Sequence, residues 1–158
     1  MIESKTVDWK LLLVCLLICL VTGAVSGIIT GNSVGTYESL NLPDFTPPAI
    51  AFPIVWTLLY ILMGVSLYLI VSRKDADIKV PVMVFAVQLL MNFCWSPIFF
   101  TYGQYLLAFV WIVLLWILVF AMILLFRRID ARAGYMQIPY LLWLIVAGYL
   151  SYSVYVLN

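Results

Sequence analysis

Aromatic rings and uncharged amides recur at spacings of three and four residues in three stretches of this sequence, and these side chains could do chemistry. Such spacing places the members of each set on one face of a helix. The three sets are Pro53, Trp56, Tyr60 and Met63; Gln88, Asn92, Trp95 and Phe99; and Tyr140, Trp143, Ala147, Leu150 and Ser151. Large rings with a few amides and hydroxyls suit a flat, mostly apolar ligand. The alternative interpretation is helix packing combined with belts of Trp and Tyr at the membrane surfaces.

The amides Gln88 and Asn92 indicate which way one of these faces points. An uncharged amide at membrane depth needs a hydrogen-bond partner, which lipid does not supply. We therefore expect the face that carries Gln88, Asn92 and Trp95 to turn toward the interior of a helix bundle.

The residue types that the sequence lacks exclude several kinds of chemistry. The chain has no His, and it has no Asp, Glu, Lys or Arg inside its apolar stretches. It therefore offers no general acid–base pair, and ion-coupled transport is disfavoured. The three cysteines lie in apolar runs, so we expect buried thiols rather than a metal site. The net charge of +1 argues against nucleic acid as a partner.

The composition makes lipid the solvent of this chain. It is 66% hydrophobic and 9% charged, more apolar than a soluble domain of 158 residues could bury. A span needs about 20 residues, so the uncharged stretch 80–126 must contain two helices, broken near Gly103. We predict an all-α integral membrane protein, a five-transmembrane-helix bundle that forms one domain over residues 1–158. The helices are expected near 9–30, 49–72, 80–101, 104–127 and 134–157, with a loop at 31–48.

The basic residues indicate an orientation in the membrane. All eight lie before the first apolar stretch, between the second and third, or between the fourth and fifth. By the positive-inside rule, we expect a cytosolic N-terminus and a C-terminus on the opposite side. A cleaved signal peptide is the alternative for the first stretch, because Lys5 and Lys10 precede an apolar run and small residues at 24–26. Against cleavage, the apolar run is long enough to span.

The predicted loop 31–48 differs from the other connections. It contains Glu38 and Asp44, the only acidic residues expected on the outer side. Its last residues, Pro47 and Pro48, directly precede the second helix, where proline is well placed. The loop is either an ordered lid over a cavity or a passive linker.

Three glycines recur every four residues in the first predicted helix, at Gly23, Gly27 and Gly31. Such a row of small residues permits the close approach of helix backbones in lipid. The packing surface lies either within the bundle or between subunits.

Three motifs, in order along nearly the whole chain, resemble one family. They are PDFTPP at 43–48 followed by FPIVWTLLY at 52–60; QLLMNFCWSPIFF at 88–100; and PYLLW at 139–143 followed by Ala147 and LSY at 150–152. These stretches are similar to the signatures of the TspO/translocator protein family, the tryptophan-rich sensory proteins that include the peripheral benzodiazepine receptor.

The resemblance implies a five-helix bundle, often dimeric, with a pocket under the first loop. Members of this family bind porphyrins such as protoporphyrin IX, benzodiazepine- and isoquinoline-type ligands and, in animals, cholesterol. Some bacterial members are assigned light-dependent porphyrin breakdown, in which the tryptophans matched by Trp56 and Trp143 are implicated. By position, the resemblance places these residues in the pocket: Tyr37 in the lid, Trp56, Tyr60, Asn92, Trp95, Phe99, Trp143 and Ala147. We add Gln88 as a polar group that orients the ligand, and Ser151 on the face of the last helix.

The sequence also departs from the family pattern. Phe45 stands where the family usually has Trp, and Ser151 stands where Asn is common. No Lys or Arg follows Tyr152, so the basic residue of the cholesterol-associated pattern in animal members is missing. Cholesterol is therefore disfavoured as the native ligand, and we expect a prokaryotic cell membrane.

Together these observations predict a membrane receptor or sensory protein that binds a porphyrin or a similar flat apolar molecule. No cofactor is required, and the expected partners are the lipid bilayer, the ligand and, for a dimer, a second copy. Two alternative functions stay open. The first is a light-dependent porphyrin-degrading catalyst that uses Trp56 and Trp143, and the second is a passive carrier of apolar metabolites.

Overall fold

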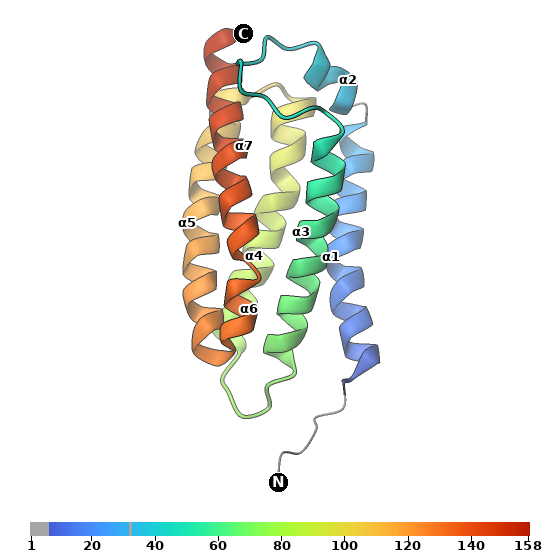
Figure 1. Ribbon diagram of the computed structural model, residues 1–158, viewed down its shortest axis with the longest axis vertical. Helices are drawn as coiled ribbons and strands as arrows, with labels where there is room; N and C mark the ends of the chain where they lie inside the picture. The colour runs from blue at the N-terminus through green and yellow to red at the C-terminus, as the bar shows by residue number, and fades with distance from the viewer. Residues whose placement is uncertain (1–6, 32) are drawn as a thin grey trace.

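Five long helices form an elongated bundle in the computed structural model, which describes residues 7–31 and 33–158 (Figure 1). The described residues contain no strand, and five of their helical segments are long and apolar enough to cross a membrane. The prediction of an all-α membrane protein with five spans is confirmed. The elements are α1 (Trp9–Thr30), α2 (Ser33–Glu38), α3 (Ala51–Val71), α4 (Lys79–Ser96), the π-helix η1 (Pro97–Thr101), α5 (Tyr105–Ile129), α6 (Ala131–Tyr135) and α7 (Ile138–Leu157).

Local residue chemistry explains where the helices begin and end. The Asp8 carboxylate accepts a hydrogen bond from the Leu11 N–H and caps α1. Gly31 ends α1 with a φ of 62°, a conformation that favours glycine. Pro97 has no N–H and interrupts the α-helical bonding of α4, which continues as one π-helical turn closed by the Tyr102 N–H on the Pro97 carbonyl. Gly103, at a φ of 59°, then turns the chain into α5.

The fifth span differs from the single predicted helix at 134–157. It consists of α6 and α7, separated at Met136 and Gln137. Pro139 stands in the first turn of α7, where its ring and missing N–H prevent a continuous helix through this point. The predicted loop 31–48 also contains the short helix α2.

The two ends of the bundle differ in charge. The described basic residues lie at the end where α1 and α4 begin and α3 and α5 end, whereas α2 and the C-terminus lie at the other end (Figure 1). Lys5 lies outside the described residues. At the basic end, Asp130 is 5% exposed and pairs with Arg73 at 2.7 Å and Arg132 at 3.0 Å. Hydrogen bonds from Arg132 and Arg73 hold the pKa of the Asp130 carboxyl well below its usual range. These ion pairs join the ends of α3, α5 and α6.

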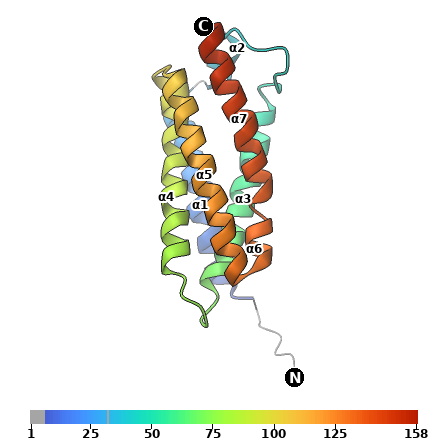
Figure 2. The ribbon, with the colours of Figure 1, turned by 90° about the vertical axis from the view of Figure 1, so that its left-hand side faces the viewer.

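The helices form a closed ring in the order α1, α3, α6 with α7, α5 and α4, and α4 packs back against α1. Figure 2 shows α5 and α7 side by side on one face of the bundle. Aromatic side chains bridge α3 and α7: Phe52 meets Trp143 at 5.6 Å between ring centroids, and Trp56 meets Tyr140 at 6.1 Å. Ring contacts therefore fill the space between these helices.

Only one member of the predicted glycine row packs tightly. Gly23 lies directly against the Tyr60 ring, so its contact is within the bundle, whereas an added Cβ at Gly27 would meet nothing within 4 Å. Among the described glycines, Gly64 of α3 makes a particularly close approach to another helix, because a Cβ there would lie 2.8 Å from the Leu16 Cα. Gly64 therefore permits the contact between α1 and α3.

We predict that Gly64→Ala destabilises the protein, because the new methyl group must push the α1 backbone away from α3. Overpacking of this kind costs about 1–3 kcal/mol. Thermal unfolding in detergent measures the effect. Gly27→Ala is the matched control, since its methyl group enters open space and should leave stability unchanged or raise it. Equal stability of the two variants would contradict the packing role of Gly64.

Candidate functional site

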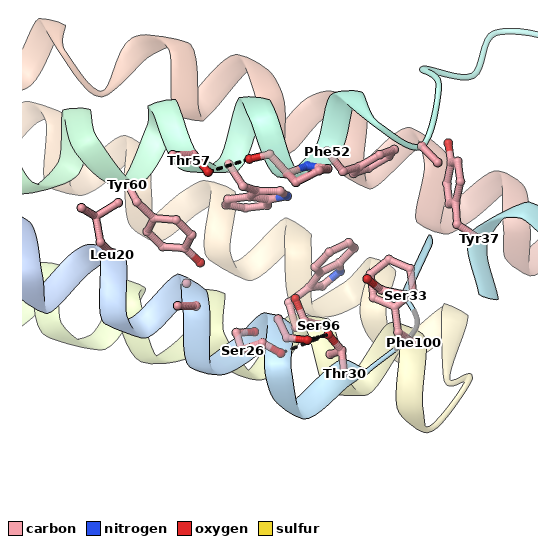
Figure 3. A pocket seen from close by; sticks show the side chains of 17 residues that line it. Leu20, Ser26, Thr30, Ser33, Tyr37, Phe52, Thr57, Tyr60, Ser96 and Phe100 are labelled. Atoms are coloured by element: carbon pink, nitrogen blue, oxygen red, sulfur yellow. Dashed lines mark hydrogen bonds between the residues drawn. The ribbon is translucent and has the colours of Figure 1, made fainter. Parts of the chain in front are cut away.

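A cavity of about 460 Å³ lies between α1, α3 and the α4–η1 junction, at the end of the bundle that carries α2 (Figure 3). Residues from α2 and from the segment before α3 contribute to its wall. The lining consists of Leu20, Gly23, Ala24, Ser26, Gly27, Thr30, Ser33, Tyr37, Ala49, Phe52, Pro53, Trp56, Thr57, Tyr60, Trp95, Ser96 and Phe100. Its size is that of a small-molecule site.

Aromatic rings dominate the side of the cavity formed by α3. Trp56 and Tyr60 lie one helical turn apart with ring centroids at 5.7 Å, and Phe52 lies at the α2 end of the cavity. Trp95 faces the cavity from α4 and stacks on Phe99 at 5.3 Å. These rings give the site broad apolar surfaces suited to another flat ring system.

The segment between α1 and α3 covers the α2 end of the cavity. Tyr37 is buried, its ring meets Phe52 edge-on at 4.9 Å, and its hydroxyl donates to the Pro47 carbonyl at 3.3 Å. This bond joins α2 to the residues that precede α3. Tyr37 and Pro47 therefore hold the described part of this segment over the cavity, where a lid would lie.

The α1 side of the cavity is small and hydroxyl-bearing. Gly23, Ala24 and Gly27 leave space, while Ser26 and Thr30 add oxygen atoms one turn apart (Figure 3). Ala24 and Gly27 on α1, like Pro53 and Thr57 on α3, line the cavity and are also exposed. The cavity is therefore open sideways, between α1 and α3, to whatever surrounds the bundle.

A buried chain of three polar side chains lies behind the inner end of the cavity. The Tyr60 hydroxyl donates to the Asn92 Oδ1 at 2.5 Å, and the Asn92 amide donates to the Tyr140 hydroxyl at 2.8 Å. All three residues are less than 10% exposed. These hydrogen bonds link α3, α4 and α7 and fix the Tyr60 ring against Gly23.

The structure distributes the predicted site residues over three places. Tyr37, Trp56, Tyr60 and Trp95 line the cavity. Phe99 and Ala147 line a second cavity of only about 10 Å³, which also touches Tyr37 and Trp95. The other four do not line either cavity. Of these, Asn92 lies behind Tyr60, Trp143 contacts Phe52, Ser151 donates to the Ala147 carbonyl at 2.8 Å, and Gln88 is fully buried.

The hydrogen-bond partner expected for the Gln88 amide is missing from the part of the chain that the structure describes. It points inward, as expected, but both atoms of its amide group lack a hydrogen-bond partner among the described residues. The requirement of a partner is met at Asn92 and not at Gln88. Gln88 therefore contributes desolvated polar atoms to the core.

Sequence reasoning missed the α1 contribution to this site. Leu20, Gly23, Gly27 and Thr30 follow one another at spacings of three and four, the pattern of a single helix face. From the sequence, Gly23 and Gly27 are interpreted only as small residues that permit helix packing. The hydroxyl of Thr30 on the same face was the signal that could have indicated a cavity wall.

The whole-chain pattern is shared with known proteins. The model of the TspO/MBR family matches residues 15–157. The tryptophan-rich protein TspO of Chlorobaculum tepidum is 39% identical over 77% of this chain and 78% of its own length. The tryptophan-rich sensory protein of Cereibacter sphaeroides is 31% identical over 77% and 76% of the two chains. The translocator protein of Ovis aries is 34% identical over 75% and 72%.

We predict that Asn92→Leu lowers the free energy of unfolding by about 2–4 kcal/mol, because each buried hydroxyl left unpaired costs about 1–3 kcal/mol. Gln88→Leu, one turn away on the same helix, is the control. It removes an amide that has no partner, so stability should stay the same or rise. Thermal unfolding of both variants in one detergent provides the measurement. Similar losses in both would mean that the polar chain through Asn92 does not stabilise the bundle.

Proposed function

The chain belongs to the TspO/MBR family, and from that premise we propose that it is a membrane receptor for porphyrins and similar flat apolar ligands. The ligand binds in the cavity between α1 and α3. The protein requires no cofactor, and its action on the cell follows from occupancy of this site. The name of the Cereibacter sphaeroides relative, a sensory protein, supports a sensory role.

One observation carries the proposal. Aromatic rings from α3 and α4 face a cavity whose opposite wall, on α1, is made of glycine, alanine and hydroxyl-bearing residues. A flat macrocycle can lie against the Trp56 and Trp95 rings while the small residues of α1 leave room for its edge. The chemistry of the lining suits binding, since the wall residues that the structure describes include no carboxylate, amine or imidazole for acid–base catalysis.

We place the basic end of the bundle in the cytosol, since Lys and Arg collect on that side of membrane proteins. The cavity then lies in the outer half of a prokaryotic cell membrane. Its opening between α1 and α3 faces lipid, from which an apolar ligand can enter.

We predict that Trp56→Leu weakens protoporphyrin IX binding about tenfold, equivalent to about 1.4 kcal/mol, through loss of a ring contact. The change in porphyrin absorbance on titration of detergent-purified protein gives the affinity without depending on tryptophan emission. Trp116→Leu is the control, because Trp116 stacks on Phe120 of α5 and does not line the cavity. Equal affinities in both variants would place the porphyrin elsewhere or in the micelle.

Light-dependent porphyrin breakdown is a second candidate, and the position of Trp56 favours it. Trp56 lines the cavity and has Tyr60 and Tyr140 as ring neighbours, so an excited porphyrin would lie beside electron-rich side chains. The pigment would supply the photochemistry and the protein the orientation. Trp143, the other tryptophan implicated by resemblance, does not line the cavity.

We predict, for this second function, that illumination of the porphyrin complex yields a distinct product and that Trp56→Phe suppresses it. Phenylalanine keeps an aromatic face but is harder to oxidise. Product formation at equal bound porphyrin, followed by absorbance, provides the measurement. Bleaching at the same rate in empty micelles would exclude catalysis.

A further inference from the structure

The described residues that line the cavity carry no positive charge. Between residues 11 and 72 the only charged residues are Glu38 and Asp44, and residues 80–126 and 133–158 contain none. Leu20, the cavity residue of α1 nearest to the basic end, follows Lys10 by 10 residues, so Lys10 lies about 15 Å along the helix from the inner end of the cavity. Among the described residues of the wall, none is a cation that could pair with an acidic group of a ligand.

The hydroxyl groups of the cavity already donate their protons to the protein. Thr57 donates to the Pro53 carbonyl at 2.7 Å, and Thr30 donates to the Ser26 and Gly27 carbonyls at 3.0 Å (Figure 3). Ser26 donates to the Phe93 carbonyl at 3.3 Å. The two tyrosines of the wall donate in the same way, to Pro47 and Asn92. These hydroxyls therefore present the lone pairs of their oxygen atoms to a ligand. Such lone pairs repel an anion and accept a hydrogen bond from an N–H group.

The Ser33 and Ser96 hydroxyls also line the cavity, as does Trp95, whose indole N–H has no hydrogen-bond partner among the described residues. A neutral hydroxyl or indole N–H is a weaker partner for a carboxylate than an ammonium or guanidinium group is. These neutral donors do not replace a cation.

The helix ends beside the cavity do not compensate for the lack of a cation. A helix N-terminus normally presents free N–H groups to anions. At the start of α3, however, the Ala51 and Phe52 N–H groups bond to the Pro48 and Ala49 carbonyls, and Pro53 has no N–H. On the other side α1 ends at Thr30, and the C-terminal end of a helix carries partial negative charge.

The charges nearest to the cavity mouth are negative. Glu38 ends α2, directly after the lid residue Tyr37, and Asp44 lies in the same covering segment. Both are exposed, so solvent screens them, but neither attracts an acidic ligand.

We infer that this cavity excludes carboxylates and selects uncharged flat aromatic ligands, in particular those with N–H groups for the lone pairs of its hydroxyls. The inference rests on the proposed function and narrows its ligand class. Moving a carboxylate into an apolar site without a partner is strongly unfavourable, so a carboxyl group there binds in its protonated form. A metal-free porphyrin therefore enters with its acid groups protonated or esterified, and its dianion binds weakly.

Gly27 provides the sharpest test, because it lines the cavity, is exposed, and has open space around its Cβ position. We compare Gly27→Arg with Gly27→Gln, using protoporphyrin IX and its dimethyl ester as the two ligands. The added guanidinium group should tighten binding of the free acid about tenfold relative to the glutamine variant, through a charge-assisted hydrogen bond. Binding of the ester should be the same in both variants. Because each comparison uses one ligand, partition into the micelle cancels.

The unchanged chain provides a second measurement that needs no substitution. The carboxyl pKa of a bound porphyrin is raised, so affinity for the free acid should increase as the pH falls through that pKa and decrease as it rises. Affinity for the ester should not change with pH.

The outcomes separate the inference from the function on which it rests. Equal, pH-independent binding of acid and ester, together with equal affinities in the two Gly27 variants, would overturn the inference and leave a porphyrin receptor. Absence of saturable binding of both ligands to the unchanged chain would overturn the proposed function and the inference with it. Ala24→Arg, on the same exposed wall, repeats the test at a second position if the Gly27 variants do not fold.

Discussion

Lipid supplies no hydrogen bonds, and this constraint governs most polar groups in the spans of this protein, with the Gln88 amide as the main exception. Serine and threonine hydroxyls bond to helix carbonyls, the Tyr60 hydroxyl reaches Asn92, and charged residues lie at the bundle ends. The same constraint shapes the cavity. Because the protein uses its own donors to satisfy its own acceptors, the wall that remains is aromatic on one side, oxygen-rich on the other and free of charge.

The cavity arises from an unequal distribution of side-chain size. Close packing of α1 and α3 at Gly64 holds the two helices together toward the basic end. Nearer to α2, the large rings of Phe52 and Trp56 lean toward α7, where they meet Trp143 and Tyr140. Opposite them, α1 presents glycine and alanine. The space left between α1 and α3 is then covered by the segment that Tyr37 and Pro47 tie together.

Long-range patterns in the sequence predicted the fold well, because the solvent imposes them. Charge-free stretches and the break near Gly103 gave five spans, and the sorting of basic residues to one end followed from their places between helices. The break at Met136 was missed because its cause, Pro139 in a first helical turn, also fits a helix start. For the site, residue faces were predictable but neighbours were not. Trp143 and Trp56 both belong to aromatic sets at helical spacing. Only three-dimensional packing decides that Trp56 lines the cavity, whereas Trp143 contacts the cavity residue Phe52 from behind.

The account depends on where a flat ligand lies, and a crystal structure of the protein with protoporphyrin IX dimethyl ester tests this most directly. We expect the macrocycle between α1 and α3, in contact with Trp56 and Trp95 and beneath Tyr37. A macrocycle held between α3 and α7 beside Trp143 and Ala147, or on the lipid-facing surface of the bundle, would contradict the account.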